Sequence, residues 1–257
     1  MPCFTELSVI KISRYLGMQI ATYNLQTYIL TLKMLTWTKN LKGLLNLFLE
    51  SNCPLCQRQT SQEFCQYCVK QLHSCHLAEP NSRWQESIPV FAWGMYSGSL
   101  KRAIAAMKYE NHPQIARPLG QWLGEAWLNS PQRNRRLIVV PIPLHSGKLK
   151  KRGYNQAALI AESFCQTTGL KLKQNGLARV RDTEAQFGLS ALEREKNLAE
   201  AFALGKQFSH YRPNVPVLLI DDIYTTGATA KSAVQVLHQC GIAVEGLAAL
   251  ATAVKER

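Results

Sequence analysis

Apolar residues follow two alternating spacings between residues 90 and 254. Unbroken apolar runs, typical of strands buried on both faces, lie at 90–96, 137–142, 217–220 and 246–254. Helical spacing of apolar residues predicts helices at 100–108, 115–128, 156–167 and 228–240, the last of them ended by Gly241. This alternation predicts an α/β fold in which helices cover both faces of a parallel sheet. Ligands of such sheets bind beyond the carboxyl ends of the strands.

The chain before residue 90 has a different organisation. Apolar residues within 41–50 are spaced as in a short helix, and five cysteines follow within 53–75. The polar stretch 79–86 indicates a linker. We therefore predict three parts, which are an extension of unknown order at 1–40, a helix plus a cysteine module at 44–78, and the α/β domain at 88–257.

The extension contains an uncharged segment, 15–32, that has the length of a membrane span. Gln19, Asn24 and Gln26 argue against a span, because burying their amides in lipid is costly. No charged start precedes a compact apolar run and a cleavage site, so we expect no signal peptide and favour the cytoplasm. A targeting peptide, or a start of the protein at Met34, stays an open alternative.

Four of the cysteines form two Cys-x-x-Cys pairs that are separated by eight residues. Two such pairs can supply four thiolates to one tetrahedral Zn²⁺ ion. We predict a closed structural zinc site whose ligands are Cys53, Cys56, Cys65 and Cys68. Free or disulfide-bonded thiols are the alternative, and His73, Cys75 and His76 follow closely enough to replace a ligand.

Basic residues are in excess, with 30 Lys and Arg against 17 Asp and Glu, for a formal charge of +13. The excess is regional, because residues 101–153 hold 11 basic and 2 acidic residues. A block of this kind is either a solvated surface or a surface that meets phosphates.

The stretch 217–229 combines a buried strand, two carboxylates and a turn that opens a helix. The free N–H groups at a helix start can bind a phosphate, and a glycine lets the backbone approach it closely. The turn residues are Thr225, Thr226, Gly227, Ala228 and Thr229. Asp221 and Asp222 would repel a phosphate, so we expect them to meet hydroxyls or a metal ion. A phosphorylated sugar offers a phosphate to the turn and hydroxyls to the two carboxylates.

Two further polar segments precede this stretch. The first is a loop at the end of a strand with basic residues after it, made of Pro141, Ile142, Pro143, Leu144 and His145 followed by Lys151 and Arg152. It suits a pyrophosphate whose charge the cations and a magnesium ion share, and a solvated loop is the alternative. The second contains Arg179, Arg181 and Gln186 and has few core residues, which is typical of a mobile loop or of an exposed helix and turn.

The segment 217–229 resembles the signature of type I phosphoribosyltransferases, whose ligand is phosphoribosyl pyrophosphate (PRPP) with magnesium. The resemblance implies a three-layer parallel sheet, with Asp221 and Asp222 on the ribose hydroxyls and the turn on the 5-phosphate. It also makes the loop at 141–145 the pyrophosphate loop, and the segment of Arg179, Arg181 and Gln186 a flexible loop that closes over the sugar.

Several motifs together resemble the ComF family, a group of phosphoribosyltransferase-like proteins associated with bacterial DNA uptake in natural competence. They are the two cysteine pairs, Lys108-Tyr109, Val140-Pro-Ile-Pro143, Arg152-Gly-Tyr-Asn-Gln156, 179–186, Arg194-x-x-Asn197 and Asp221-Asp-x-x-Thr-Thr-Gly227. The resemblance covers about 44–254. It implies a cytoplasmic protein, or one peripheral to the inner membrane, that works with DNA-uptake proteins.

Three functions stay open. A phosphoribosyltransferase would need an acceptor nucleophile, which the sequence does not identify. A second possibility is binding of single-stranded DNA, since cations and aromatic rings can track a strand and stack on its bases. Its candidate residues are Lys101, Arg102, Lys108, Arg117, Arg133, Arg135, Arg136, Tyr96, Tyr109 and Tyr154. The third is a scaffold that docks the uptake machinery at the membrane through 1–50 and the zinc module.

Overall fold

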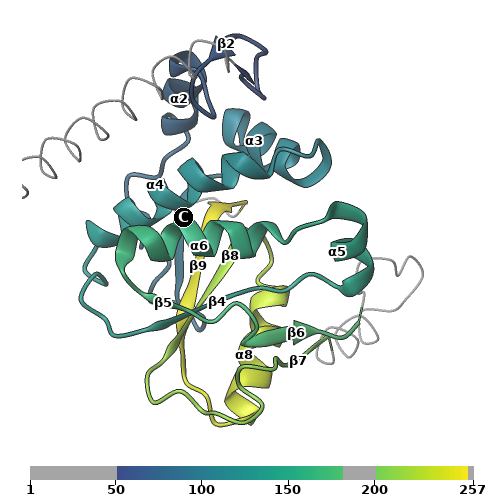
Figure 1. The fold of residues 1–257 in the computed structure, drawn as a ribbon. Coiled ribbons are helices and arrows are strands. Elements are labelled where there is room, and N and C mark those ends of the chain that lie inside the picture. Colours follow the sequence, from purple (N-terminus) through teal and green to yellow (C-terminus); the bar gives the residue numbers. More distant parts are fainter. Residues whose placement is uncertain (1–50, 182–200, 254–257) are drawn as a thin grey trace, which may run out of the picture. The chain divides into compact units, whose positions relative to one another are not determined.

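A five-stranded parallel sheet forms the middle layer of the fold in the computed structural model, which describes residues 51–181 and 201–253 (Figure 1). Its order is β3-β9-β8-β4-β5, and every neighbouring pair is parallel. The strands are β3 (Val90–Met95), β9 (Val244–Thr252), β8 (Val217–Tyr224), β4 (Ile138–Pro141) and β5 (Lys171–Leu172). The predicted α/β fold with a parallel sheet is therefore confirmed.

Helices lie on both faces of this sheet (Figure 1). The face with α4 (Ala116–Leu128) and α6 (Gln156–Thr168) receives Leu218 and Ile220 of β8, and the face with α8 (Ala228–Gln239) receives Val217 and Leu219. Successive side chains of a strand point to opposite faces, so a strand between two helical layers has to be apolar throughout. This explains the unbroken apolar run of β8.

The remaining helices connect and flank these layers. They are α2 (Gln66–His73), α3 (Gly98–Tyr109), the short 3₁₀ helix η1 (Pro113–Ile115) and α5 (Ser146–Arg152). The sequence did not predict α5, because Leu149 is the only apolar residue within it and one residue makes no apolar stripe. Three basic residues fill its last turn, where cations favour the negative end of the helix dipole.

Strand β8 extends beyond the apolar run that predicted it. The predicted strand ended at Ile220, whereas the ladder with β9 continues through Asp221, Ile223 and Tyr224. Backbone pairing does not depend on side-chain polarity, so the two carboxylates belong to the strand itself. A short antiparallel pair, β6 (Leu177–Arg179) with β7 (Phe202–Leu204), was not predicted either, because its strands are distant in sequence.

From Asn52 onward, the described residues form one compact unit. Strands β1 (Ser51–Asn52) and β2 (Gln59–Thr60) pair beside the cysteines and precede α2. The extension at 1–40, the helix predicted within 41–50 and the uncharged segment 15–32 lie outside the described residues, and the predicted domain boundaries stay a prediction. Where the structure is described, every helix is too short or too polar to cross a membrane.

Candidate functional site

A pocket of about 220 Å³ opens where the carboxyl ends of β4 and β8 lie side by side. It brings together residues that the sequence assigned to three separate segments. The predicted site residues that line it are Ile142, Pro143, Leu144, Arg152, Arg179, Asp221, Asp222, Thr225 and Thr229. The structure thus places the two loops and the end of β6 around one cavity.

The other predicted site residues do not line this pocket. Pro141 is buried in β4, and the imidazole of His145 caps α5 by accepting a hydrogen bond from the N–H of Gly147 at 3.4 Å. Lys151 and Arg181 have exposed side chains outside the pocket lining. Gln186 lies outside the described residues, so the loop predicted to close over the sugar stays a prediction.

The turn between β8 and α8 has the geometry that its sequence requires. Gly227 is the N-cap of α8 and has φ 77°, a left-handed conformation that glycine adopts without strain. The hydroxyl of Thr226 accepts a weak hydrogen bond, 3.5 Å long, from the N–H of Ala228. Thr225 and Thr229 face the pocket from either side of this turn. The start of α8, with its positive dipole end, therefore lies at the pocket edge, where an anion can bind.

The two carboxylates of β8 have different surroundings. Asp222 is buried at 7% exposure, and its oxygens accept hydrogen bonds from Lys108 Nζ at 2.9 Å and Gln156 Nε2 at 3.4 Å. Asp221 is half-buried, and its Oδ1 accepts the backbone N–H of Asp222 at 2.8 Å. Asp222 is thus engaged by two protein side chains, whereas Asp221 accepts a hydrogen bond from the neighbouring peptide group.

These surroundings shift two pKa values. Burial, together with the adjacent carboxylate of Asp222, raises the pKa of Asp221 to about 7. Burial disfavours the charged ammonium of Lys108, but the carboxylates of Asp222 and Asp221 outweigh that effect and raise its pKa. Lys108 therefore stays protonated at neutral pH beside the carboxylate pair.

Four cationic side chains line the pocket together with the two carboxylates. They are Lys108, Lys148, Arg152 and Arg179. The guanidinium of Arg152 lies 5.8 Å from the ring centroid of Tyr109, whose side chain is 78% exposed at the pocket edge. Clustered cations attract an anion, and carboxylates accept hydrogen bonds from hydroxyls. The pocket can hold a ligand that carries both kinds of group.

Seven lining residues are not among the predicted site residues, although four of them belong to motifs of the family resemblance. They are Lys108, Tyr109, Lys148, Asn155, Gln156, Ala157 and Ile223. Asn155 is the N-cap of α6, where its oxygen accepts the N–H of Ala157 at 3.1 Å and its amide donates to the carbonyl of Ile142 at 2.9 Å. It thereby fixes the loop after β4 against α6. The available signal for the four was their place in the motifs Lys108-Tyr109, at the end of α3, and Arg152-Gly-Tyr-Asn-Gln156, at the start of α6.

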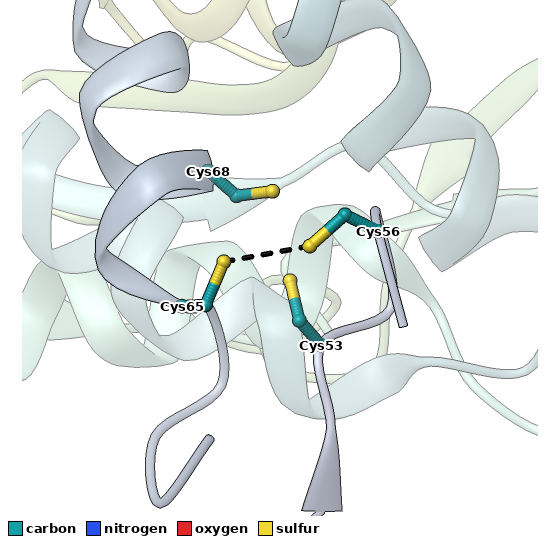
Figure 2. A group of neighbouring side chains, drawn as sticks. All are labelled: Cys53, Cys56, Cys65 and Cys68. Carbon is teal, nitrogen blue, oxygen red and sulfur yellow. Dashed lines mark hydrogen bonds between the residues drawn. The ribbon is translucent and has the colours of Figure 1, made fainter. Parts of the chain in front are cut away.

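The four predicted zinc ligands also converge, at a second place in the fold (Figure 2). The sulfur atoms of Cys53, Cys56, Cys65 and Cys68 all lie within 4.8 Å of one another, and those of Cys56 and Cys65 are 3.4 Å apart. Zn–S bonds of about 2.3 Å in a tetrahedron place sulfur atoms about 3.8 Å apart. The N–H of Cys68 lowers the pKa of the Cys65 thiol to about 6. These four thiols could hold a metal ion.

His73 and His76 are not part of this cluster. The imidazole of His73 packs against the ring of Trp122 at a centroid distance of 4.5 Å, and His76 packs against Trp93 at 5.1 Å. Trp93 and Trp122 are themselves stacked. The two histidines therefore belong to an aromatic contact between the cysteine module and the sheet domain.

The residues expected to track DNA are only partly available for that role. Lys108 pairs with Asp222, while Arg117 pairs with Glu63 and Arg135 with Glu245. The hydroxyl of Tyr154 donates to the backbone carbonyl of Met107, so its ring belongs to the packing of the fold.

Comparison with known proteins gives relatives along most of the chain. "Competence protein F" of Haemophilus influenzae is 31% identical over 213 residues, which are 78% of this chain and 90% of the relative. "DNA utilization protein YhgH" of Salmonella typhimurium is 27% identical over 203 residues, 74% of this chain and 86% of the relative. No protein-family model matches the chain.

Solved structures of similar shape include the adenine phosphoribosyltransferase of Leishmania tarentolae. It is 14% identical to this chain, with a TM-score of 0.37, and the match covers 68% of this chain and 93% of that one.

Proposed function

The chain belongs to the ComF family of competence proteins, and from this premise we propose that it binds PRPP with Mg²⁺ in the pocket beyond β4 and β8 and acts in DNA uptake. The observation that carries the proposal is the convergence of a helix N-terminus, four cationic side chains and two carboxylates on one cavity. PRPP is a sugar with a phosphate at one end and a pyrophosphate at the other. The helix N-terminus and the cations suit these anionic groups, and the carboxylates suit the sugar hydroxyls.

Each part of PRPP has candidate contacts in the pocket. The turn at 225–229 offers N–H groups and hydroxyls to the 5-phosphate, since it opens α8. The loop after β4, with Lys148 and Arg152 close by, offers positive charge to the pyrophosphate. Asp221, which faces the same cavity, offers acceptors to ribose hydroxyls. The assignments of the turn, the loop and Asp221 agree with those that the family resemblance implies, which places Asp222 on the ribose hydroxyls as well.

Magnesium fits the same donor set. Carboxylate and phosphate oxygens are the hard ligands that Mg²⁺ prefers, and Asp221 lines the pocket on the side of β8. Bound with the pyrophosphate, the ion would neutralise part of its negative charge. The protein's own contribution is to orient the sugar and to hold both anionic groups.

The proposal is one of ligand binding. A transferase would also need an acceptor nucleophile, and the residues that line the pocket specify none.

Isothermal titration of the protein with PRPP in the presence of magnesium tests the proposal. We expect saturable binding that Asp221→Asn weakens about tenfold or more, because the variant replaces an acceptor oxygen by an NH₂ group. Glu162→Gln, which removes an exposed carboxylate on α6, is the matched control and should bind as the unmodified protein does. Absence of binding by the unmodified protein would refute the proposed function.

For the cysteine cluster we propose a structural zinc ion. Cys53 and Cys68 are fully buried and pack in the same apolar cluster as Phe64, so the ion would be enclosed by the fold. A closed site with four thiolates leaves no position for a substrate, which is the arrangement of structural zinc.

A second candidate function is binding of single-stranded DNA, and the exposed ring of Tyr109 favours it. A ring at 78% exposure with a guanidinium over it can stack on a base. Affinity for a single-stranded oligonucleotide should fall steeply with salt, and Tyr109→Ala should weaken it about fivefold or more. Unchanged affinity in Tyr109→Ala would exclude this ring from DNA binding.

A further inference from the structure

Gln156 is the first residue of α6 and contributes a buried amide to the wall of the pocket. Its exposure is 2%, and it lies beside Asp222, to whose Oδ2 its Nε2 donates a hydrogen bond of 3.4 Å. Its carbonyl oxygen, Oε1, is buried and has no hydrogen-bond partner among the described residues. The NH₂ group of this amide is therefore bound by the protein, and its carbonyl oxygen could accept a hydrogen bond from a ligand.

The orientation of this amide is determined by its neighbour. A side-chain amide can be turned by 180°, but only its NH₂ group can donate to the carboxylate of Asp222. The opposite orientation would place the carbonyl oxygen against carboxylate oxygens, which repel it. Lys108 holds Asp222 from the other side, through Oδ1, so the carboxylate has little freedom to move away. Oε1 is thus fixed as an acceptor.

A buried acceptor without a donor is unfavourable, and such groups in native proteins call for an explanation. The neighbouring amide of Asn155 shows the contrast, because both its oxygen and its nitrogen have backbone partners. Phosphate groups carry no donor at neutral pH once they are ionised, so they leave Oε1 unpaired. A hydroxyl group is the part of a phosphorylated sugar that can donate to it.

We propose that Gln156 determines specificity in this pocket by accepting, through Oε1, a hydrogen bond from a ring hydroxyl of a pentose 5-phosphate. This inference rests on the proposed function and adds a residue to it. Asp222 is then a positioning residue, because its carboxylate holds the amide of Gln156 and the ammonium of Lys108 in place. Asp221 remains as the carboxylate that meets the sugar directly, so the two acids have different roles.

The inference predicts a selectivity for hydroxylated sugars that depends on one side chain. Titration with ribose 5-phosphate, 2-deoxyribose 5-phosphate and 3-deoxyribose 5-phosphate should show that one of the deoxy sugars binds the unmodified protein about tenfold more weakly than ribose 5-phosphate. In Gln156→Leu, which keeps the size of the side chain but has no acceptor, that difference should fall below about twofold.

Two further variants separate this role from a general effect on folding. Gln156→Glu, when protonated beside Asp222, keeps a donor to that carboxylate and a second oxygen that can accept a hydrogen bond, so it should retain the selectivity. Ser163→Ala removes another buried hydrogen bond of α6, to the carbonyl of Arg117, and should leave the selectivity unchanged. Thermal melting of each variant reports whether it is folded.

The outcomes distinguish the inference from the proposed function. If the unmodified protein binds neither PRPP nor ribose 5-phosphate, both fall. If it binds them without discriminating against either deoxy sugar, or if folded Gln156→Leu discriminates as the unmodified protein does, the role of Gln156 is wrong and the proposed function stands.

Discussion

The ammonium of Lys108 and the carboxylate of Asp222 form an ion pair with an N–O distance of 2.9 Å across the pocket wall. The pair joins the last turn of α3 to β8, the strand that carries both pocket carboxylates. Both side chains are largely buried, at 20% and 10% exposure. Because burial removes both groups from water, each charge is stabilised mainly by the other.

Lys108→Met should therefore destabilise the protein. It would leave the carboxylate of Asp222 buried without its cation, at a cost of about 3 kcal/mol in the free energy of unfolding. Urea denaturation at pH 7 measures this. Lys101→Met, at an exposed position of the same helix, should change the free energy of unfolding by less than about 0.5 kcal/mol.

Combining Lys108→Met with Asp222→Asn gives the decisive comparison. The double variant removes both charges, so it should regain part of the stability that the single variant loses. Equal stability of the double variant and Lys108→Met would show that the pair is not coupled.

The parts of this site that sequence predicted differ from those it missed in a physical way. The turn at 225–229, the loop at 141–145 and the cysteine cluster each lie within one short stretch of the sequence, so the chemistry of each is visible there. The partnership of Lys108 with Asp222 spans 114 positions and depends on how α3 packs against the sheet. The prediction from sequence counted Lys108 among DNA-binding cations for that reason, because an isolated lysine in a basic region gives no sign of its partner.

The raised pKa of Asp221 predicts a pH dependence of stability. Its value of about 7 in the folded protein lies above the ordinary value of about 3.9 for an unfolded chain. Between these values the folded protein binds a proton that the unfolded chain has released, so the contribution of this group is full below pH 4 and is lost as the pH rises to 7. Relative to Asp221→Asn, the unmodified protein should lose stability between pH 4 and pH 7, with no further change above.

Urea denaturation of both proteins at a series of pH values checks this expectation, because the difference between them isolates Asp221. Glu162→Gln serves as the control at an exposed position, and its difference from the unmodified protein should vary little with pH. A constant difference for Asp221→Asn across the range would contradict the raised pKa.

Metal analysis and thermal melting test the zinc proposal. Cys53→Ser should abolish stoichiometric zinc and lower Tm by about 10 °C or more, since the loss of a structural ion removes folding free energy. Cys240→Ser, at a cysteine outside the cluster, should retain both the zinc content and the Tm of the unmodified protein. A chelator should reproduce the loss of Tm in the unmodified protein. Full zinc content in Cys53→Ser would show that the ligand set is wrong.

The two glycines that flank α8 provide a matched pair for the phosphate turn. Gly227 precedes the helix with φ 77° and Gly241 follows it with φ 72°, so alanine at either position incurs a similar backbone strain of about 1–2 kcal/mol. They differ in the space available. A Cβ at residue 241 would have no atom within 4 Å, whereas one at residue 227 would lie 2.6 Å from the hydroxyl of Tyr224.

Gly227→Ala should thus be more destabilising than Gly241→Ala by about 1 kcal/mol, because the Tyr224 ring has to move as well. Tyr224→Phe removes the nearest atom and should restore part of the difference when combined with Gly227→Ala. Only Gly227→Ala should also weaken PRPP binding, since it alters the backbone that we propose to bind the 5-phosphate. Urea denaturation and isothermal titration measure the two effects, and equal losses of stability at the two positions would exclude a specific role for the contact with Tyr224.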